Sequence, residues 1–204
     1  MYIQRFVNAS CLTIFDEQDI FTANDTVTTR ANMNIELKKI QAHETALFKS
    51  EMKLAFEQGV LDRFGSLDAA PIPPENEIDE ALKNSDFDVF FITLNGTPAG
   101  GTIIKCEANK KYSLDLLFIF KHFLNKKIGS AAWQVIEAHY PDAVLWETHT
   151  PYFERRNIHF YLNKCGFKIV EFFCEYHKES HDLTNEFKDV KTSGFFRFEK
   201  VMKK

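Results

Sequence analysis

The stretch that decides the fold runs from Leu114 to Tyr140 and reads LDLLFIFKHFLNKKIGSAAWQVIEAHY. Its first part predicts an apolar strand, its middle a basic turn, and its last part a helix that begins at about Gly129. The first backbone N–H groups of a helix have no intrahelical partner, and the helix dipole gives them partial positive charge. Together with Lys126 and Lys127, this helix start predicts a phosphate or pyrophosphate site. An ordinary strand-to-helix connection with solvated lysines is the competing interpretation.

The residues that follow the turn predict a crossover between two parallel strands. Apolar residues recur at helical spacing after the turn, and Pro141 ends the pattern. The segment 143–148 (AVLWET) then predicts a strand directly after the helix. A strand–helix–strand order makes the two strands parallel, and a ligand crevice opens at the carboxyl ends of strands where the strand order switches.

The rest of the chain predicts an α/β (α+β) fold with a mixed, largely antiparallel sheet of about seven strands. Alternating or apolar segments predict strands over 34–40, 88–94, 100–106, 112–119, 143–148, 167–176 and 195–202. Helices are predicted over 43–58, ended by Gly59, over 75–83, from Gly129, and over 153–165, ended by Gly166. Asn95-Gly96 predicts a hairpin turn. Residues 1–32 show no sustained period and are assigned to an N-terminal extension, with the domain over 33–204.

Composition narrows the class of protein. The chain has 204 residues, 45% of them hydrophobic, and a net charge of −4, which disfavours a broad nucleic-acid-binding surface. No run approaches the roughly twenty apolar residues of a membrane helix, and the N-terminus is too polar for a signal peptide. The four cysteines show neither a disulfide framework nor metal-ligand spacing. We therefore expect a cytoplasmic protein without a metal; its oligomeric state is left open, with a homodimer among the options.

From Met33 to Lys204 the chain resembles the GNAT superfamily of acyl-CoA-dependent N-acyltransferases. The matching pieces are the strand LDLLFI, the turn and helix LNKKIGSAAW, the strand VLWET, and PYFERRNIHFYLNKCGF. The last piece is the most specific, with Asn157, then Phe160-Tyr161, then Gly166-Phe167. The resemblance implies a GNAT-like sheet with helices on both faces and acetyl-CoA as cosubstrate.

The turn departs from the family's pattern. That pattern is Q/R-x-x-G-x-G/A, whereas here Leu124 replaces the Gln or Arg and Lys127 replaces the first Gly, so that only Gly129 is intact. A lysine in left-handed backbone would cost about 1 kcal/mol, but nothing if the turn is helical. The departure bears on the tightness of CoA binding rather than on the fold.

The resemblance also implies roles for individual residues. The strand Leu116–Ile119 should splay at a bulge, where the backbone of Leu117, Phe118 and Ile119 binds the pantetheine arm. The residues expected at the pyrophosphate are Asn125, Lys126, Lys127, Ile128, Gly129 and Ser130. Asn157 and Tyr161 lie four apart, hence on one helix face. Asn157 would bind the pantetheine or phosphate region, and the Tyr161 phenol would act as general acid near the sulfur.

The proton of the acceptor amine needs a base, and Glu147 is the first candidate, before Asp115 and His149. Each has an alternative role: Glu147 paired with Arg155 or Arg156, Asp115 on a solvated face, and His149 as a helix cap. Tyr161 has one as well, as an ordinary core tyrosine. The acceptor is expected to be a small-molecule or peptide amine, bound by the loops 56–74 and 177–194.

Two functions remain at this point. The first is an N-acetyltransferase that transfers the acetyl group directly to a primary amine in a ternary complex. The second is a non-catalytic acyl-CoA-binding or regulatory protein that keeps the GNAT fold. The motifs of P-loop proteins, dinucleotide-binding folds and serine or cysteine hydrolases are absent from the sequence.

Overall fold

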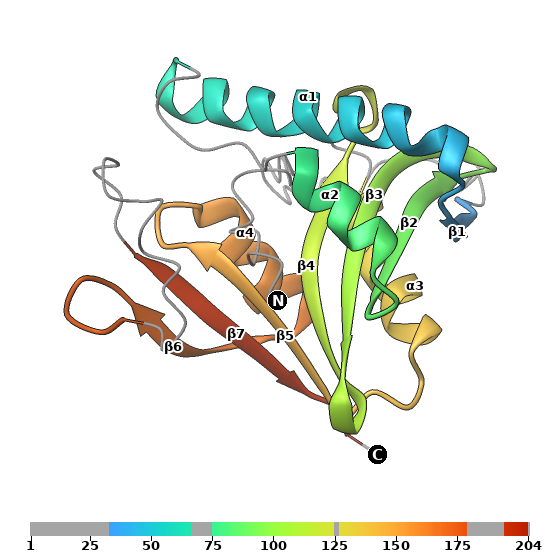
Figure 1. Cartoon of the computed structure of the whole chain (residues 1–204). Helices are drawn as coiled ribbons and strands as arrows, with labels where there is room; N and C mark the ends of the chain where they lie inside the picture. Colours follow the sequence, from blue (N-terminus) through green and yellow to red (C-terminus); the bar gives the residue numbers. More distant parts are fainter. Residues whose placement is uncertain (1–32, 67–74, 125–126, 179–193, 204) are drawn as a thin grey trace, which may run out of the picture.

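The computed structural model describes residues 33–66, 75–124, 127–178 and 194–203, which form a seven-stranded sheet flanked by helices (Figure 1). The strand order is β1-β2-β3-β4-β5-β7-β6. The strands are β1 (Ile35–Lys39), β2 (Phe87–Leu94), β3 (Thr97–Glu107), β4 (Lys111–Ile119), β5 (Leu145–Pro151), β6 (Lys168–Phe173) and β7 (Phe195–Val201). The helices are α1 (Thr45–Phe64), α2 (Glu75–Lys83), α3 (Ile128–His139) and α4 (Arg155–His159). Short 3-10 turns are η1 (Ala42–Glu44), η3 (Ala108–Lys110) and η4 (Lys121–Phe123), and a π-helix, η5 (Phe160–Cys165), continues α4.

The sheet has the predicted mixed topology. β4 and β5 are parallel, whereas the other five neighbouring pairs are antiparallel. Asn95 and Gly96 have φ values of 51° and 80°, the left-handed pair that a tight hairpin between β2 and β3 requires. The predicted fold class, including the single parallel crossover through α3, is confirmed.

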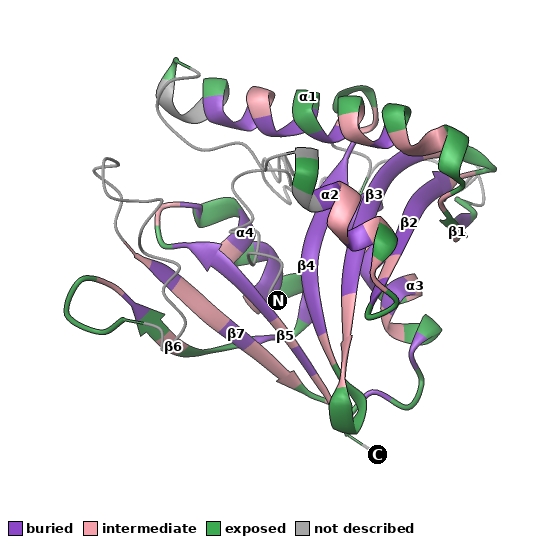
Figure 2. Ribbon diagram, in the orientation of Figure 1, coloured by how far each residue is buried: buried purple, intermediate pink, exposed green. Residues whose placement is uncertain are grey.

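Helices cover both faces of the sheet, as predicted. In Figure 1, α1 and α2 lie over one face of β2–β4, and α3 lies on the other. Figure 2 shows that β2, β3 and β4 are buried along much of their length between these layers. The α1/α2 layer buries a cluster that includes Phe48, Met52, Phe56, Ile78, Phe91 and Phe118. The α3 layer buries a second cluster with Leu117, Trp133, Ile136, Trp146, Tyr161 and Phe198.

Helix α1 packs closely on the sheet at Gly101. A Cβ atom there would lie 2.4 Å from Phe48 Cε2 and 2.6 Å from Phe118 Cε1. The Phe48 ring meets the Phe91 and Phe118 rings edge-on at centroid distances of 5.5 and 5.2 Å. Only a residue without a side chain permits this approach, so Gly101 fixes how α1 sits on β3 and β4.

The predicted end of the first helix at Gly59 is wrong. The helix continues to Phe64 and ends at Gly65, whose φ is 73° and whose N–H donates to Leu61 O at 2.9 Å. Phe56 and Val60 are buried, so packing on the sheet carries the helix past Gly59. Gly65 therefore supplies the left-handed cap that the sequence suggests for Gly59.

The remaining boundaries differ less. β5 begins at Leu145 and extends to Pro151, and β6 ends at Phe173 rather than Tyr176. The expected helix over 153–165 is present as α4 and η5, with Gly166 (φ 79°) as its left-handed cap. The N-terminal extension 1–32, most of the loop 177–194, and residues 67–74 of the first loop lie outside the described residues.

Candidate functional site

The site is built where β4 and β5 diverge. Their parallel pairs end at Ser113 and Glu147. Just beyond, Thr148 Oγ1 donates to Leu114 O at 2.9 Å, so a side chain takes the carbonyl that a continuing ladder would use. Figure 1 shows the two strands separating beyond this point, toward the end of β4 that leads to α3. We call this region, bounded by residues 115–119 of β4 and 148–151 of β5, the splay.

A bulge in β4 coincides with the start of the splay. On β3, Ile103 pairs with Leu116 and Ile104 pairs with Leu114, which leaves Asp115 as the extra residue. The register from Leu116 to Ile119 is regular, so the bulge lies one residue before the predicted segment. Pantetheine binding by the backbone of Leu117, Phe118 and Ile119 remains a prediction.

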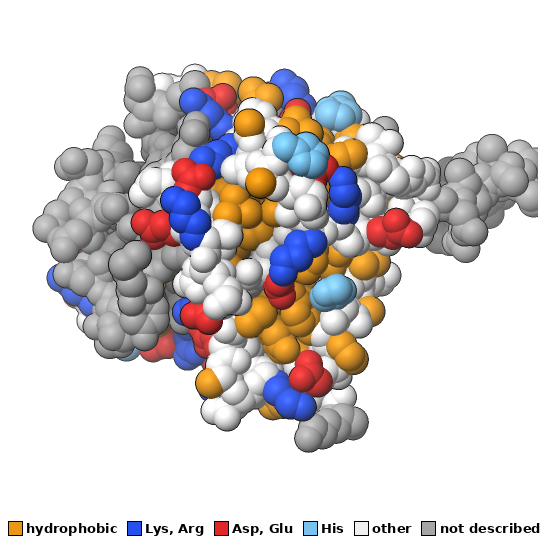
Figure 3. Space-filling view, turned by 45° about the vertical axis from the view of Figure 1, so that its right-hand side comes forward, with side chains coloured by type: hydrophobic (Ala, Val, Ile, Leu, Met, Phe, Trp, Pro, Cys, Tyr) orange, Lys and Arg blue, Asp and Glu red, His pale blue; other side chains and the backbone are white. Residues whose placement is uncertain are grey.

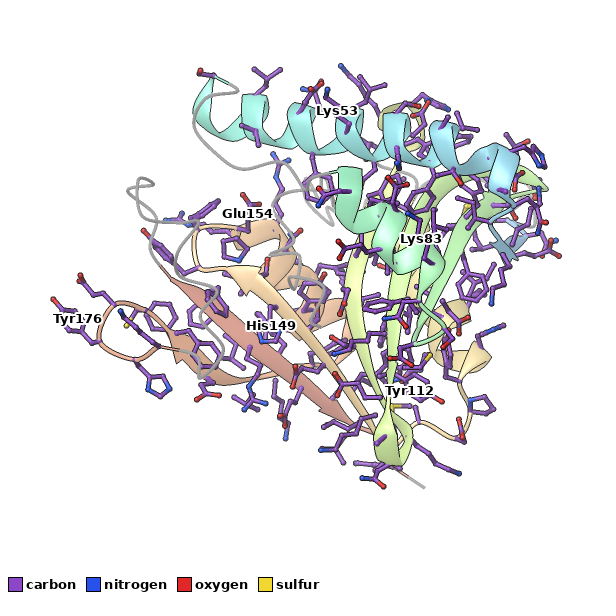
Figure 4. All side chains as sticks on the ribbon, viewed as in Figure 1. Lys53, Lys83, Tyr112, His149, Glu154 and Tyr176 are labelled. Carbon is purple, nitrogen blue, oxygen red and sulfur yellow. The ribbon has the colours of Figure 1, made fainter. Side chains whose placement is uncertain are left out.

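The side chains of the splay divide between two faces. On β4, Leu116 and Phe118 pack with the α1/α2 cluster, whereas Leu117 and Ile119 pack with the α3 cluster. On β5, Trp146 packs against Trp133 of α3 at a ring-centroid distance of 5.2 Å. Because side chains alternate along a strand, Glu147 and His149 face the opposite way, toward the α1/α2 side. Figure 4 shows His149 at the middle of β5.

The turn before α3 contains a backbone outlier. Lys127 has φ 55° and ψ 16°, in the left-handed region, and is exposed. Its carbonyl accepts from Ala131 N at 3.3 Å, so it is the residue at which α3 begins. Ile128 and Gly129 are buried and Ser130 is half-buried at the helix start. Lys127 therefore has the left-handed backbone that carries a conformational cost. Asn125 and Lys126 lie outside the described residues.

Asn157 joins α4 to the end of β5. It is 2% exposed, and its Nδ2 donates to Thr150 Oγ1 at 3.4 Å. The predicted neighbour on the same helix face, Tyr161, is 1% exposed. Its ring lies between those of Phe160, Phe167 and Phe198, with centroids 5.5 to 5.7 Å away. Both side chains are thus on the inner side of α4 and η5; their roles toward a ligand remain predictions.

The alternative roles of two base candidates are wrong. Asp115 is 4% exposed, so it does not lie on a solvated face. His149 is also 4% exposed and does not cap the next helix, whose N-cap is Glu154. The His149 ring instead packs with Phe173 and Phe195, with centroids at 6.4 and 5.7 Å.

Glu147 pairs with an arginine that sequence reasoning missed. Arg197 of β7 contacts Glu147 of β5 at 3.2 Å, Glu171 of β6 at 2.9 Å, and Glu199 on its own strand. The expected partners Arg155 and Arg156 are both exposed on α4. No local pattern identifies Arg197, because two of its partners lie 26 and 50 residues away in the chain.

The charges around Arg197 stabilise one another. Burial lowers the pKa of Arg197, but the carboxylates of Glu147, Glu199 and Glu171 outweigh it, so that this pKa is raised. The pKa of Glu171 is lowered, first by the hydrogen bond to His177, whose Nε2 lies 2.8 Å from the carboxylate, and then by Arg197. Three carboxylates thus surround one guanidinium on a face of β5, β7 and β6 that Figure 2 shows as largely half-buried along β7.

Other kinds of site find less support. Among the described residues there is no group of three or more His, Cys, Asp or Glu side chains that would hold a metal ion. Within the same part of the chain, no helix is both long and apolar enough to cross a membrane. On the described part of the face in Figure 3, acidic and basic side chains are interspersed among apolar ones, without a continuous region of one sign.

Comparison with known proteins shows which family the chain belongs to and which fold it has. No protein-family model matches it. YrkN of Bacillus subtilis (strain 168), itself described as uncharacterized, is 42% identical over 162 residues, covering 77% of this chain and 88% of YrkN. Among solved structures, the PaiA N-acetyltransferase of Thermoplasma acidophilum with coenzyme A has a TM-score of 0.61 at 17% identity, covering 83% of this chain and 100% of that one. The chain belongs to the YrkN family and has the GNAT fold.

Two further solved structures agree with this fold. The ribosomal-protein-S18-alanine N-acetyltransferase of Escherichia coli has a TM-score of 0.60 at 11% identity, covering 84% of this chain and 96% of its own. A Bacillus subtilis acetyltransferase in complex with CoA has a TM-score of 0.55 at 16% identity, covering 84% and 99%. The similarity thus spans nearly the whole of these proteins, and the predicted GNAT-like fold is confirmed.

Proposed function

We propose that this YrkN-family protein is an N-acetyltransferase that transfers the acetyl group of acetyl-CoA directly to a primary amine in a ternary complex. The observation that carries the proposal is the splay, which opens at the bulge in β4. From there β4 leads, through η4, to the start of α3. Two of the GNAT-fold neighbours were solved with coenzyme A. A cytoplasmic location is proposed with it.

The residues around the splay fit coenzyme A. Beyond Ser113 the edge of β4 faces the splay rather than β5, and an extended ligand can pair with such an edge. Lys127 is exposed at the start of α3, where a phosphate would meet both a cation and the helix dipole. Asn157 supplies a buried amide at the end of β5. The β4 edge and Asn157 match an extended amide-containing arm, and Lys127 at the helix start matches a diphosphate.

Acetyl-CoA, when bound, supplies an acetyl group on a thioester sulfur. This chain's part is to position that group and to move two protons. Tyr161 is proposed as the donor to the sulfur, from the π-helix, a distortion that often marks functional sites. Glu147, Asp115 and His149 are the groups around the splay that can accept a proton from the amine.

The acceptor is proposed to be a cationic amine on a small molecule or peptide. The α1/α2-side face of β5, β7 and β6 holds Glu147, Glu171 and Glu199 beside Arg197, and Lys168 shares that face as the register partner of Glu199. These carboxylates attract an ammonium group toward the mouth of the splay. Which amine is acetylated depends on the loops 67–74 and 179–193, which lie outside the described residues.

The first experiment is calorimetric titration of the full chain with CoA. Wild type is expected to bind, and Asn157→Ala to bind about ten-fold more weakly, because it loses a buried hydrogen-bonding group. Asn163→Ala is the matched control, since Asn163 lies on the same helix but is exposed. Absence of CoA binding by wild type would contradict the proposal.

The second experiment measures thiol release from acetyl-CoA with polyamines, amino acids, aminoglycosides and lysine peptides. Tyr161→Phe should lower kcat about 10²-fold while CoA affinity is retained. Tyr152→Phe is the control, because Tyr152 is 42% exposed. A Tyr161→Phe enzyme as fast as wild type at every pH would remove the acid role.

One observation favours the second function, a CoA-binding protein without turnover. Lys127 holds left-handed backbone at the helix start where the GNAT pattern has glycine. CoA binding without thiol release for every amine tested would establish this function in place of the first.

A further inference from the structure

We infer that His149 is the group that accepts the proton of the acceptor amine, and that Asp115, on the facing strand of the splay, orients its imidazole. This inference rests on the proposed acetyltransferase function. It changes the predicted assignment of the base from Glu147 to a pair of residues on two different strands.

The register places the two residues at the same level. Ser113 and Glu147 form the last parallel pair between β4 and β5. Two residues further along each strand come Asp115 and His149, at the point where the strands begin to separate. Asp115 is also the extra residue of the bulge, which breaks the regular pairing at that level.

His149 faces the α1/α2 side, and Asp115 lies where β4 changes faces. Leu114 packs with the α3 cluster and Leu116 with the α1/α2 cluster, so the alternation shifts at the bulge, with Asp115 as the residue between them. On β5, His149 is the register partner of Arg197, and partners in an antiparallel pair share a face. The proton acceptor and the acidic face proposed for the amine therefore lie on one side of the sheet.

Packing holds the His149 ring. Phe173 stacks on it at 6.4 Å with an interplanar angle of 28°, and Phe195 contacts it at 5.7 Å. His149 and Asp115 are each 4% exposed. A base shielded in this way keeps a fixed orientation and loses little catalytic effect to bulk water.

Glu147 is less suited to accept a proton. Its Oε2 accepts a hydrogen bond from Arg197 Nη1 at 3.2 Å, so one carboxylate oxygen is already engaged by a guanidinium of β7. Imidazole has an ordinary pKa of about 6.5, near the pH at which a general base works best. Among the described residues, the charged groups on the face of β5, β7 and β6 that His149 shares are Glu147, Arg197, Glu199, Glu171 and Lys168. Asp115 lies on β4, and His177 stacks on Phe173 beyond β6.

The proton transfers balance. The ammonium acceptor first releases one proton to solvent; as the neutral amine nitrogen then bonds the acetyl carbon, His149 takes the second proton that the nitrogen loses. The carbon–sulfur bond breaks with its electron pair on sulfur, and Tyr161 donates a proton there. One proton then returns from His149 to Tyr161 through solvent, so the protein ends the cycle unchanged. No oxidant, reductant or metal takes part in these steps.

The test compares His149→Gln, Asp115→Asn and the control His43→Gln, which removes an exposed histidine of η1. For wild type, kcat/KM should fall as pH decreases through the pKa of His149, and NMR of the protein without substrates should show that ring titrating at the same pH. His149→Gln should lower kcat/KM about 10²-fold and abolish this fall at low pH, the acidic limb of the pH profile. Asp115→Asn should move both the NMR titration and the limb to lower pH by the same amount, because a carboxylate favours the imidazolium.

The outcomes separate this inference from the proposed function. A wild type that does not bind CoA would overturn the function itself. Turnover with an unchanged acidic limb in His149→Gln, or an NMR titration of His149 that does not coincide with the limb, would overturn only the inference. If His149→Gln does not fold, two results test the inference instead: the NMR titration of His149 must coincide with the acidic limb in wild type, and both must shift together in Asp115→Asn. A lowered melting temperature without a change in pH profile would show that His149 is only a packing residue.

Discussion

Replacing Lys127 by glycine should stabilise the protein. A residue with a Cβ atom costs about 1–2 kcal/mol in left-handed backbone, and Lys127 has φ 55° and ψ 16°. Glycine avoids this cost but loses about 0.5–1 kcal/mol through its freedom in the unfolded chain. The net gain is about 1 kcal/mol, or about 2–4 °C in melting temperature for a domain of this size.

The charge of Lys127 contributes separately and needs its own control. A cation at a helix start opposes the helix dipole, so its removal adds about 0.3–1 kcal/mol in any variant. Lys127→Ala removes the same charge but keeps a Cβ atom. Lys127→Gly should therefore melt about 2–4 °C above Lys127→Ala, measured by calorimetry at the same pH and salt concentration.

Affinity for CoA should respond in the opposite way. Both variants lose an exposed cation beside the proposed diphosphate site, which is worth about 0.2–1 kcal/mol, so each Kd should rise by up to about five-fold. If Lys127→Ala is as stable as Lys127→Gly, backbone strain is not the cause of any gain. If both bind CoA as tightly as wild type, Lys127 does not contact the diphosphate.

Three further predictions concern the scaffold. Gly101→Ala should lower stability by about 1–3 kcal/mol, seen as a fall in melting temperature, because its Cβ would lie 2.4 Å from Phe48 Cε2; an unchanged melting temperature would show that α1 shifts freely. Burial raises the pKa of Asp88, but hydrogen bonds outweigh it, including one from Tyr140 Oη at 2.9 Å, so the folded pKa lies below the unfolded one. Ionised Asp88 therefore stabilises the folded protein fully above its unfolded pKa of about 3.9, and this stabilisation is lost as the pH falls through its lower folded pKa. Tyr140→Phe should make that loss of stability smaller in acid unfolding curves. Burial, with Asp88, raises the pKa of Cys106 to about 11, so native Cys106 should resist iodoacetamide at pH 8 and react only after unfolding, as peptide mass spectrometry would show.

The elements that sequence predicted well carry strong local signals. Asn95-Gly96 permits only a narrow range of turns, and alternation over 34–40 identifies a strand with one buried face. The first helix shows the limit of such signals. Gly59 and Gly65 are equally good candidates for its end, and only contacts of Phe56 and Val60 with the sheet decide between them.

The placement of side chains was predictable where residues lie close in sequence and not where they meet across strands. Asn157 and Tyr161 share one motif, and both are on the inner side of α4 and η5. Arg197 lies in the closing strand, and its role depends on which strands border it in space. The position of the bulge likewise follows from pairing with β3, although the polar Asp115 in an apolar strand was a usable signal.

The narrow strip where β4 meets β5 has a mechanical consequence. In the part of the chain that the structure describes, three backbone residue pairs and the hydrogen bond from Thr148 Oγ1 to Leu114 O join β4 to β5. Strands β1–β4 lie between the α1/α2 cluster and the α3 cluster. Strands β5, β7 and β6 bury apolar side chains mainly in the α3 cluster. A ligand bound in the splay would therefore contact both halves of the sheet and add to the few backbone pairs that join them.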